Sequence, residues 1–129
     1  MENVIKPHLV KPVLEKVIFE MIGLPQANAM INIKPEDAID VRKVSEEIVK
    51  VTLTRNLLIS PENIMKVAVV MSIDIPVDSI EFSKLSDPKE YIKNSQPVRI
   101  LVSYASNIIT NITMNTILGP IITPPNLQV

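Results

Sequence analysis

The last thirty residues, Ile100 to Val129, contain no charged side chain, and this feature constrains the fold more than any other. Every Lys, Arg, Asp and Glu of the chain lies at or before Arg99. Pro97 suits the first turn of a helix, and Gly119 suits the position just past its end. Between them the apolar residues recur at the spacing of one helical face: Val98, Leu101, Val102, Ala105, Ile108, Ile109 and Ile112. The pattern predicts one long helix over Val98–Leu118.

The opposite face of this predicted helix carries neutral polar residues four positions apart: Ser103, Asn107, Asn111 and Asn115. A helix in contact with water normally carries charged side chains on that face. We therefore expect another subunit or a bound polypeptide to cover it. The residues expected at an interface between subunits are Tyr104, Asn107, Ile108, Asn111 and Asn115.

Two other structures fit parts of the same stretch. A membrane span has the right length, but the Asn, Ser and Thr residues within it would be costly in a bilayer. A β structure fits the alternation of Ile112, Met114 and Thr116, because Ile, Val and Thr are poor helix formers. The helix is the preferred prediction, and no membrane partner is expected.

Composition favours one soluble intracellular domain in a chain of 129 residues. Residues 1–12 form an N-terminal tail that Pro7 and Pro12 keep from being helical, and residues 13–129 form the domain. The absence of cysteine excludes disulfides and thiolate chemistry. A net charge of −1 gives no electrostatic case for nucleic acid. The N-terminus lacks the pattern of an export signal, so we expect a cytoplasmic location.

Alternating apolar and polar residues predict four strands before the helix: Val13–Ile22, Ala38–Val44, Ile48–Leu58 and Ile64–Ile75. The last two form the clearest antiparallel pair, joined by a turn at residues 60–63. Asp87-Pro88 suits the cap and first position of a helical turn through Ile92. The expected fold class is α+β, with a four-stranded antiparallel sheet followed by a long C-terminal helix and an extended Pro-rich tail.

The segment Leu24–Glu36 is apolar for a loop. It fits a loop packed over the edge of the core, or a movable flap over a hydrophobic site.

Catalytic chemistry has little support, and we do not expect an enzyme. The only histidine, His8, lies in the N-terminal tail. The acidic pairs Glu36-Asp37 and Glu46-Glu47 lie in predicted turns and are expected to be solvated. No Gly-rich loop, nucleophile motif or pair of catalytic acids is present, and no metal or other cofactor is expected.

Short runs of the sequence follow the order of a known family. Phe19-Glu20 ends the first predicted strand, and Lys34-Pro35-Glu36 leads into the second. Lys50-Val51-Thr52-Leu53-Thr54 lies in the third strand, Ser103-Tyr104-Ala105-Ser106 in the helix, and Pro124-Pro125-Asn126-Leu127 in the tail. Over about residues 13–128, this series resembles the SecB family of protein-export chaperones.

The sequence also departs from the SecB pattern. Ile33 and Leu127 stand where the family has aromatic residues, and Ser106 stands where it has an arginine. The family's docking positions for its motor ATPase correspond to Lys16, Lys66 and Ala68, with only Glu20 matching. The resemblance therefore implies that binding of a translocation motor ATPase is altered or absent.

The resemblance implies a homotetramer, a dimer of dimers in which the long helices lie between sheets. It also implies an ATP-independent holdase that binds unfolded or precursor polypeptides in hydrophobic grooves, with a role in protein export. The residues expected to line such a groove are Leu24, Met30, Ile31, Ile33, Ile75, Val77, Ile121 and Ile122. The alternatives are a partner-specific chaperone, such as one for an antitoxin, and an oligomeric adaptor without chaperone activity.

Overall fold

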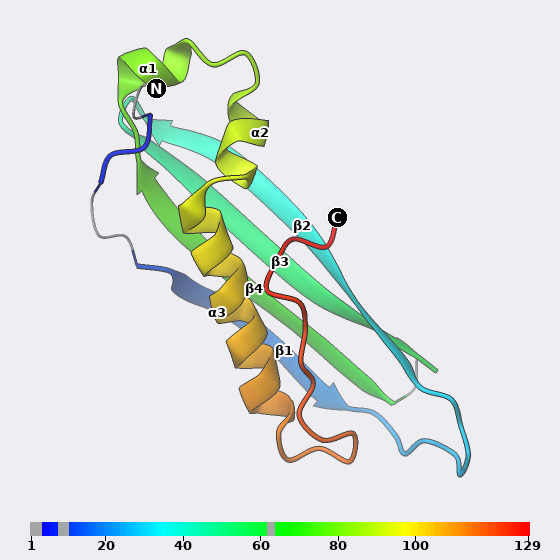
Figure 1. Cartoon of the computed structure of the whole chain (residues 1–129). Coiled ribbons are helices and arrows are strands. Elements are labelled where there is room, and N and C mark those ends of the chain that lie inside the picture. Colours follow the sequence, from blue (N-terminus) through cyan, green and yellow to red (C-terminus); the bar gives the residue numbers. More distant parts are fainter. Residues whose placement is uncertain (1–3, 8–10, 62–63) are drawn as a thin grey trace.

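The computed structural model describes residues 4–7, 11–61 and 64–129. Within these residues the fold is α+β, as predicted: four antiparallel strands form one sheet in the order β1-β4-β3-β2, and the longest helix, α3, lies across one face of it (Figure 1). The strands are β1 (Val13–Met21), β2 (Asn32–Ser45), β3 (Ile48–Ser60) and β4 (Met65–Pro76). The helices are α1 (Ser79–Ser83), α2 (Pro88–Lys93) and α3 (Gln96–Thr113).

The pairing of β3 with β4 confirms the strongest alternation in the sequence. Val51 lies opposite Ile73, and Leu53 lies opposite Met71. Residues opposite each other in an antiparallel pair point to the same face of the sheet, and all four of these side chains are buried. They belong to one hydrophobic core with the buried stripe of α3. We call this face of the sheet the helix side.

Helix α3 begins with Pro97 in its first turn, as predicted, and buries a stripe formed by Val98, Leu101, Val102, Ala105 and Ile109. It ends at Thr113, whereas the sequence predicted an end at Leu118. Beyond Thr113 the backbone continues in tight turns, including a hydrogen bond from the N–H of Gly119 to the carbonyl of Thr116. Gly119 has a φ of +73°, which suits a glycine because it has no Cβ.

The second strand starts earlier than predicted. Residues 32–36 belong to β2, so the prediction of a loop through Glu36 is wrong. Pairing of Ile33 with Ile59 extends the strand, and Pro35 is tolerated because β2 is at the edge of the sheet. The prediction that Asp37 is a solvated turn residue is also wrong, since its side chain is buried in the strand.

The segments outside the sheet differ from the predictions in detail. Val4 is buried and Ile5 forms an isolated bridge with Val77, so this part of the predicted N-terminal tail packs on the domain.

The helical turn α2 is confirmed, with the Asp87 carboxylate accepting from the N–H of Glu90 at 3.2 Å. The sequence did not predict α1. His8 and residues 62–63 of the predicted turn lie outside the described residues.

Arg55 of β3 is fully buried and joins the sheet to α3 and to the C-terminal tail. It lies directly opposite Asp37 of β2. Its Nε and Nη2 each donate to one oxygen of the Asp37 carboxylate, both at 2.7 Å. Its Nη1 donates to the hydroxyl of Ser106 at 2.8 Å and to that of Thr123 at 3.0 Å. We call Arg55, Asp37, Ser106 and Thr123 the Arg55 cluster.

The same arginine holds the tail through main-chain carbonyls. The guanidinium donates to the carbonyl of Pro124 at 2.6 Å and to that of Asn126 at 2.9 Å. Asp37 continues the attachment, because its Oδ2 accepts from the N–H of Gln128 at 2.8 Å and its own N–H donates to the Gln128 carbonyl at 2.9 Å. The extended tail that the sequence predicted therefore runs back over the helix side of the sheet to β2 (Figure 1).

We expect the substitution Arg55→Ala to lower the free energy of unfolding by about 3–5 kcal/mol, the usual loss when one partner of a buried ion pair is removed. The substitution leaves the Asp37 carboxylate buried without a cation, and it frees the tail carbonyls from their donor. Urea denaturation followed by circular dichroism measures this change.

The matched control is Lys84→Ala, which removes an exposed ion pair with Glu81. This control should change the free energy of unfolding by no more than about 1 kcal/mol. Equal stability of Arg55→Ala and the parent protein would contradict the role given to the Arg55 cluster.

Candidate functional site

The eight residues predicted to line a client groove do not form one continuous surface in the protomer. Leu24, Met30 and Ile122 are 77–82% exposed, and Ile31 and Ile33 are partly buried. The other three are buried in the core: Ile75, Val77 and Ile121.

The three buried residues are fixed in the core by their neighbours. Ile75 lies opposite Val49 on the helix side, and the N–H of Val77 donates to the carbonyl of Glu47. The N–H of Ile121 donates to the hydroxyl of Thr113 at 2.8 Å. Of the predicted groove residues, the well-exposed ones are therefore Leu24 and Met30, between β1 and β2, and Ile122 in the tail.

The segment between β1 and β2, residues 22–31, is the most exposed apolar part of the predicted set. Leu24, Pro25 and Ala29 line a hollow of about 290 Å³ together with Pro61. Asn28 takes a positive φ of 65°, which asparagine tolerates better than most residues, and the turn lets the segment fold back toward β2. We call residues 22–31 the crossover segment.

An exposed apolar surface on β1 was not among the predicted site residues. The register places Leu14, Val17, Phe19 and Met21 on the helix side, opposite buried residues of β4, yet each of them is 38–48% exposed. Helix α3 packs chiefly on β4, and β1 lies beyond it at the edge of the sheet. We call these four residues the β1 strip. The alternation of Val17, Phe19 and Met21 was visible in the sequence, but it could not show that the helix leaves them uncovered. A register shift between Leu14 and Lys16 brings Leu14, which the alternation did not include, to the same side.

The β1 strip lies on a strand that is paired on one side only. Among the described residues β1 pairs with β4 alone, so its outer edge presents main-chain N–H and C=O groups to solvent. An apolar strip beside such an edge can accept another strand, since the main chain supplies hydrogen bonds and the side chains supply burial.

The residues predicted at a subunit interface lie on or just beyond the outward side of α3. Tyr104 is 45% exposed, and Asn107, Asn111 and Asn115 are also exposed in the protomer. Ile108 is partly buried against the core. The neutral face predicted from the sequence is therefore open in a single protomer, and its burial by another subunit stays a prediction.

The sheet face opposite α3 carries charged residues of both signs beside apolar ones such as Ile18 and Leu58. Glu20, the predicted motor-docking residue, is exposed and lies opposite Lys66 of β4, while Ala68 is buried. The hydroxyl of Ser72 and the ammonium of Lys50 lower the pKa of Glu15. This carboxylate therefore stays ionised to lower pH than usual, and the face keeps both charge signs.

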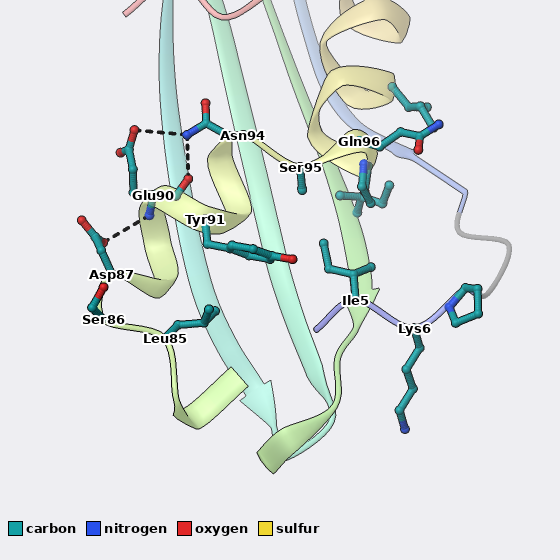
Figure 2. A pocket seen from close by; sticks show the side chains of 14 residues that line it. Ile5, Lys6, Leu85, Ser86, Asp87, Glu90, Tyr91, Asn94, Ser95 and Gln96 are labelled. Atoms are coloured by element: carbon teal, nitrogen blue, oxygen red, sulfur yellow. Dashed lines mark hydrogen bonds between the residues drawn. The ribbon is translucent and has the colours of Figure 1, made fainter. Parts of the chain in front are cut away.

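A cavity of about 800 Å³ lies at the other end of the sheet, between α2, the start of α3 and residues 5–7. Figure 2 shows Tyr91 and Leu85 pointing across it toward Ile5. Ile73 and Ile100 add apolar walls. We call it the α2 cavity. The sequence analysis did not predict it, because its walls come from three separated segments.

Two kinds of site are not found in the described part of the chain. No three His, Cys, Asp or Glu side chains come together there in a way that could hold a metal ion. None of its helices combines the length and apolar character needed to cross a bilayer.

Comparison with known proteins gives a match by structure and none by sequence. No protein-family model matches the chain, and no curated protein matches it. A SecB-like chaperone of Mycobacterium tuberculosis, solved in complex with a ChAD peptide from the HigA1 antitoxin, superposes with a TM-score of 0.70. The match covers 88% of this chain and 86% of that chain at 11% sequence identity. The chain has a SecB-like fold.

A second solved structure is much less similar. A protein of unknown function from Streptococcus agalactiae matches with a TM-score of 0.41 and 11% identity, over 91% of this chain and 98% of that chain. This similarity is too low to support a comparison of folds.

One departure noted in the sequence belongs to the Arg55 cluster. The resemblance places an arginine at the position of Ser106 in the helix. In this chain Ser106 accepts a hydrogen bond from the guanidinium of Arg55 of β3 at 2.8 Å. The Arg55 guanidinium, which comes from the sheet, thus lies beside Ser106, the helix residue that stands where the resemblance places an arginine.

The predicted groove residues can be sorted experimentally into surface and core. We expect Ile75→Ala to lower the free energy of unfolding by about 2–5 kcal/mol, because it opens a cavity in a packed core. Met30→Ser should change it by less than about 0.5 kcal/mol, as is usual for an exposed position. Urea denaturation of both variants measures the difference, and similar losses in both would contradict the placement of Met30 on the surface.

Proposed function

We propose that this protein is an ATP-independent chaperone that binds non-native polypeptides on exposed apolar surfaces. The observation that carries the proposal is the exposed apolar surface formed by the β1 strip and the crossover segment, on a SecB-like fold. The similar SecB-like chaperone of Mycobacterium tuberculosis was solved with a peptide from an antitoxin, which supports polypeptide as the class of ligand.

Apolar burial alone can provide such binding. Each square ångström of apolar surface removed from water contributes about 25 cal/mol, whatever the exact sequence of the client. Leu24, Met30 and Ile122 are flexible or aliphatic side chains that can adapt to different partners. No nucleotide is needed for this step, because the binding energy comes from contact with the client.

We also propose that the protein is a homotetramer, a dimer of dimers. The open edge of β1 and the exposed neutral face of α3 provide two separate surfaces for contacts between copies. Asn107 and Asn111 can hydrogen-bond across an interface at less cost than charged residues would incur on burial. Tyr104 would supply apolar area and a hydroxyl at the same surface.

A partner-specific chaperone is the second candidate. It is favoured by the residues at the family's motor-docking positions, where Lys16 and Lys66 replace acidic or apolar side chains. The antitoxin peptide bound by the similar chaperone also favours a partner-specific chaperone. This candidate predicts one tightly bound client, whereas a general holdase predicts many weakly bound ones. A role in export and a cytoplasmic location belong to the general holdase proposal.

Suppression of aggregation is the direct test of the proposal. The protein at stoichiometric amounts, without nucleotide, should suppress the light scattering of a chemically denatured model client diluted into buffer. Absence of suppression at several-fold excess would reject chaperone activity and would favour an adaptor whose apolar surface serves self-association only.

The double substitution Leu24→Ser with Met30→Ser should weaken client binding about tenfold or more, because two large apolar side chains no longer contribute to burial. The matched control is Ile80→Ser, which removes an apolar side chain, 66% exposed, on α1, away from the crossover segment. Titration of each variant against a fluorescently labelled unfolded client measures the affinity. Equal weakening in the control would contradict a site at the crossover segment.

A further inference from the structure

The C-terminal tail consists of a part that is fixed in the core and an end that lies on the surface. Ile121 and Thr123 are buried. The N–H of Ile121 donates to the hydroxyl of Thr113 at 2.8 Å, and its carbonyl accepts from the hydroxyl of Thr110 at 2.9 Å. Beyond Thr123 no residue of the tail is buried, and Pro125, Asn126 and Val129 are exposed. We call residues 124–129 the terminal strap.

The terminal strap is held through its main chain. The carbonyl of Pro124 accepts from Arg55 Nη1 at 2.6 Å, and that of Asn126 accepts from Nη2 at 2.9 Å. The N–H and the carbonyl of Gln128 both bond to Asp37. Among the described residues, the side chains of Asn126 and Gln128 form hydrogen bonds only within the strap. Another polypeptide with the same extended course can make these contacts, because nearly every residue carries the same main-chain groups.

One apolar side chain adds to these main-chain contacts. Leu127 is partly buried and packs against the hydrophobic core, whereas Val129 is 89% exposed. The strap carries no charged residue. The surface beneath it therefore accepts an extended, uncharged segment with one apolar residue at the position of Leu127.

Release of the strap leaves the buried guanidinium paired. Nε and Nη2 of Arg55 keep the Asp37 carboxylate, and Nη1 keeps the hydroxyls of Ser106 and Thr123. Release does free the donors that face the strap's carbonyls: the guanidinium, the Ser106 hydroxyl and the N–H of Asp37. Donors that lose their acceptors in a partly buried place are costly, so the vacated surface favours a new main chain.

The position of this surface suits a client. Asp37 lies on β2, an edge strand that begins directly after the crossover segment. The strap reaches β2 from the side of α3 (Figure 1). A polypeptide bound at the crossover segment can therefore continue along β2 into the place that the strap occupies.

We propose that Arg55 and Asp37 form a main-chain binding site, which the terminal strap occupies in the free protein and an extended client segment takes in its place. Carbonyls of the client accept from Arg55 and Asp37, and one apolar side chain replaces that of Leu127. Because the strap is tethered, it competes at a high effective concentration and holds back weakly binding clients. This proposal rests on the proposed function in taking non-native polypeptide as the ligand.

Removal of the strap is the first test. Deletion of residues 124–129 should tighten binding of an unfolded client about tenfold, because the site no longer has a tethered competitor. The probe is a reduced and alkylated protein that stays unfolded in buffer, labelled with fluorescein and titrated by anisotropy. A synthetic peptide of residues 123–129 should reverse the gain. Absence of the gain, or a gain that the peptide leaves unchanged, would overturn the proposal.

A full-length variant loosens the strap without shortening the chain. Gln128→Pro removes the N–H that donates to Asp37 and should tighten binding of the same probe about threefold or more. The matched control is Asn126→Ala, which removes a side chain that bonds only within the strap and should leave the affinity unchanged. Equal affinities of the two variants would contradict the proposal, also where the shortened protein does not fold.

Amide hydrogen exchange in the native protein distinguishes this proposal from the proposed function. Binding of the probe should speed exchange at Gln128, while the N–H of Asp37 stays protected by a carbonyl of the probe. Unchanged exchange at Gln128 with the probe bound would overturn the proposal and leave the proposed function standing. Faster exchange at both residues would show opening without replacement and would also overturn the proposal. Failure of both the full-length and the shortened protein to bind the probe would reject the proposed function itself, and this proposal with it.

Discussion

The ion pair between Arg55 and Asp37 is the interaction on which the rest of the structure depends. It is buried and bidentate, and all three guanidinium nitrogens are satisfied by β2, α3 or the tail. An arginine at this depth is tolerable only with such a complete set of acceptors, because an unpaired buried charge is very costly. The cluster thus specifies one arrangement in which the helix, the tail and the β2 edge meet over β3.

This arrangement also determines what remains uncovered. The tail occupies the helix side toward β2, and α3 covers β4, so β1 is left with its apolar strip and its outer edge open. The neutral outward face of α3 is exposed in the same protomer. A single copy therefore exposes an apolar strip on β1 and an uncharged face on α3. The proposed binding of clients and the proposed association of copies both rest on this one distribution of covered and uncovered apolar area.

The parts of the fold that could be predicted from sequence are those set by local pattern. Alternation over β3 and β4 identified the central pair and its buried side, and Asp87-Pro88 identified the start of α2. The buried role of Arg55 could not be predicted in the same way. A charged residue interrupts the alternation of apolar positions, and only its partners explain why it is buried. Asp37 and Ser106 lie 18 and 51 residues away from it in the chain. The site was predicted less well, since exposure of Phe19 and burial of Ile75 depend on where α3 crosses the sheet.

The central claim is that one protomer is incomplete, and that other copies cover the open edge of β1 and the neutral face of α3. Sedimentation velocity of the purified protein over a range of concentrations tests this claim most directly. We expect a closed oligomer whose mass is a multiple of the 14.4 kDa protomer, four copies in the proposed arrangement. A single species of 14.4 kDa at every concentration would contradict the claim.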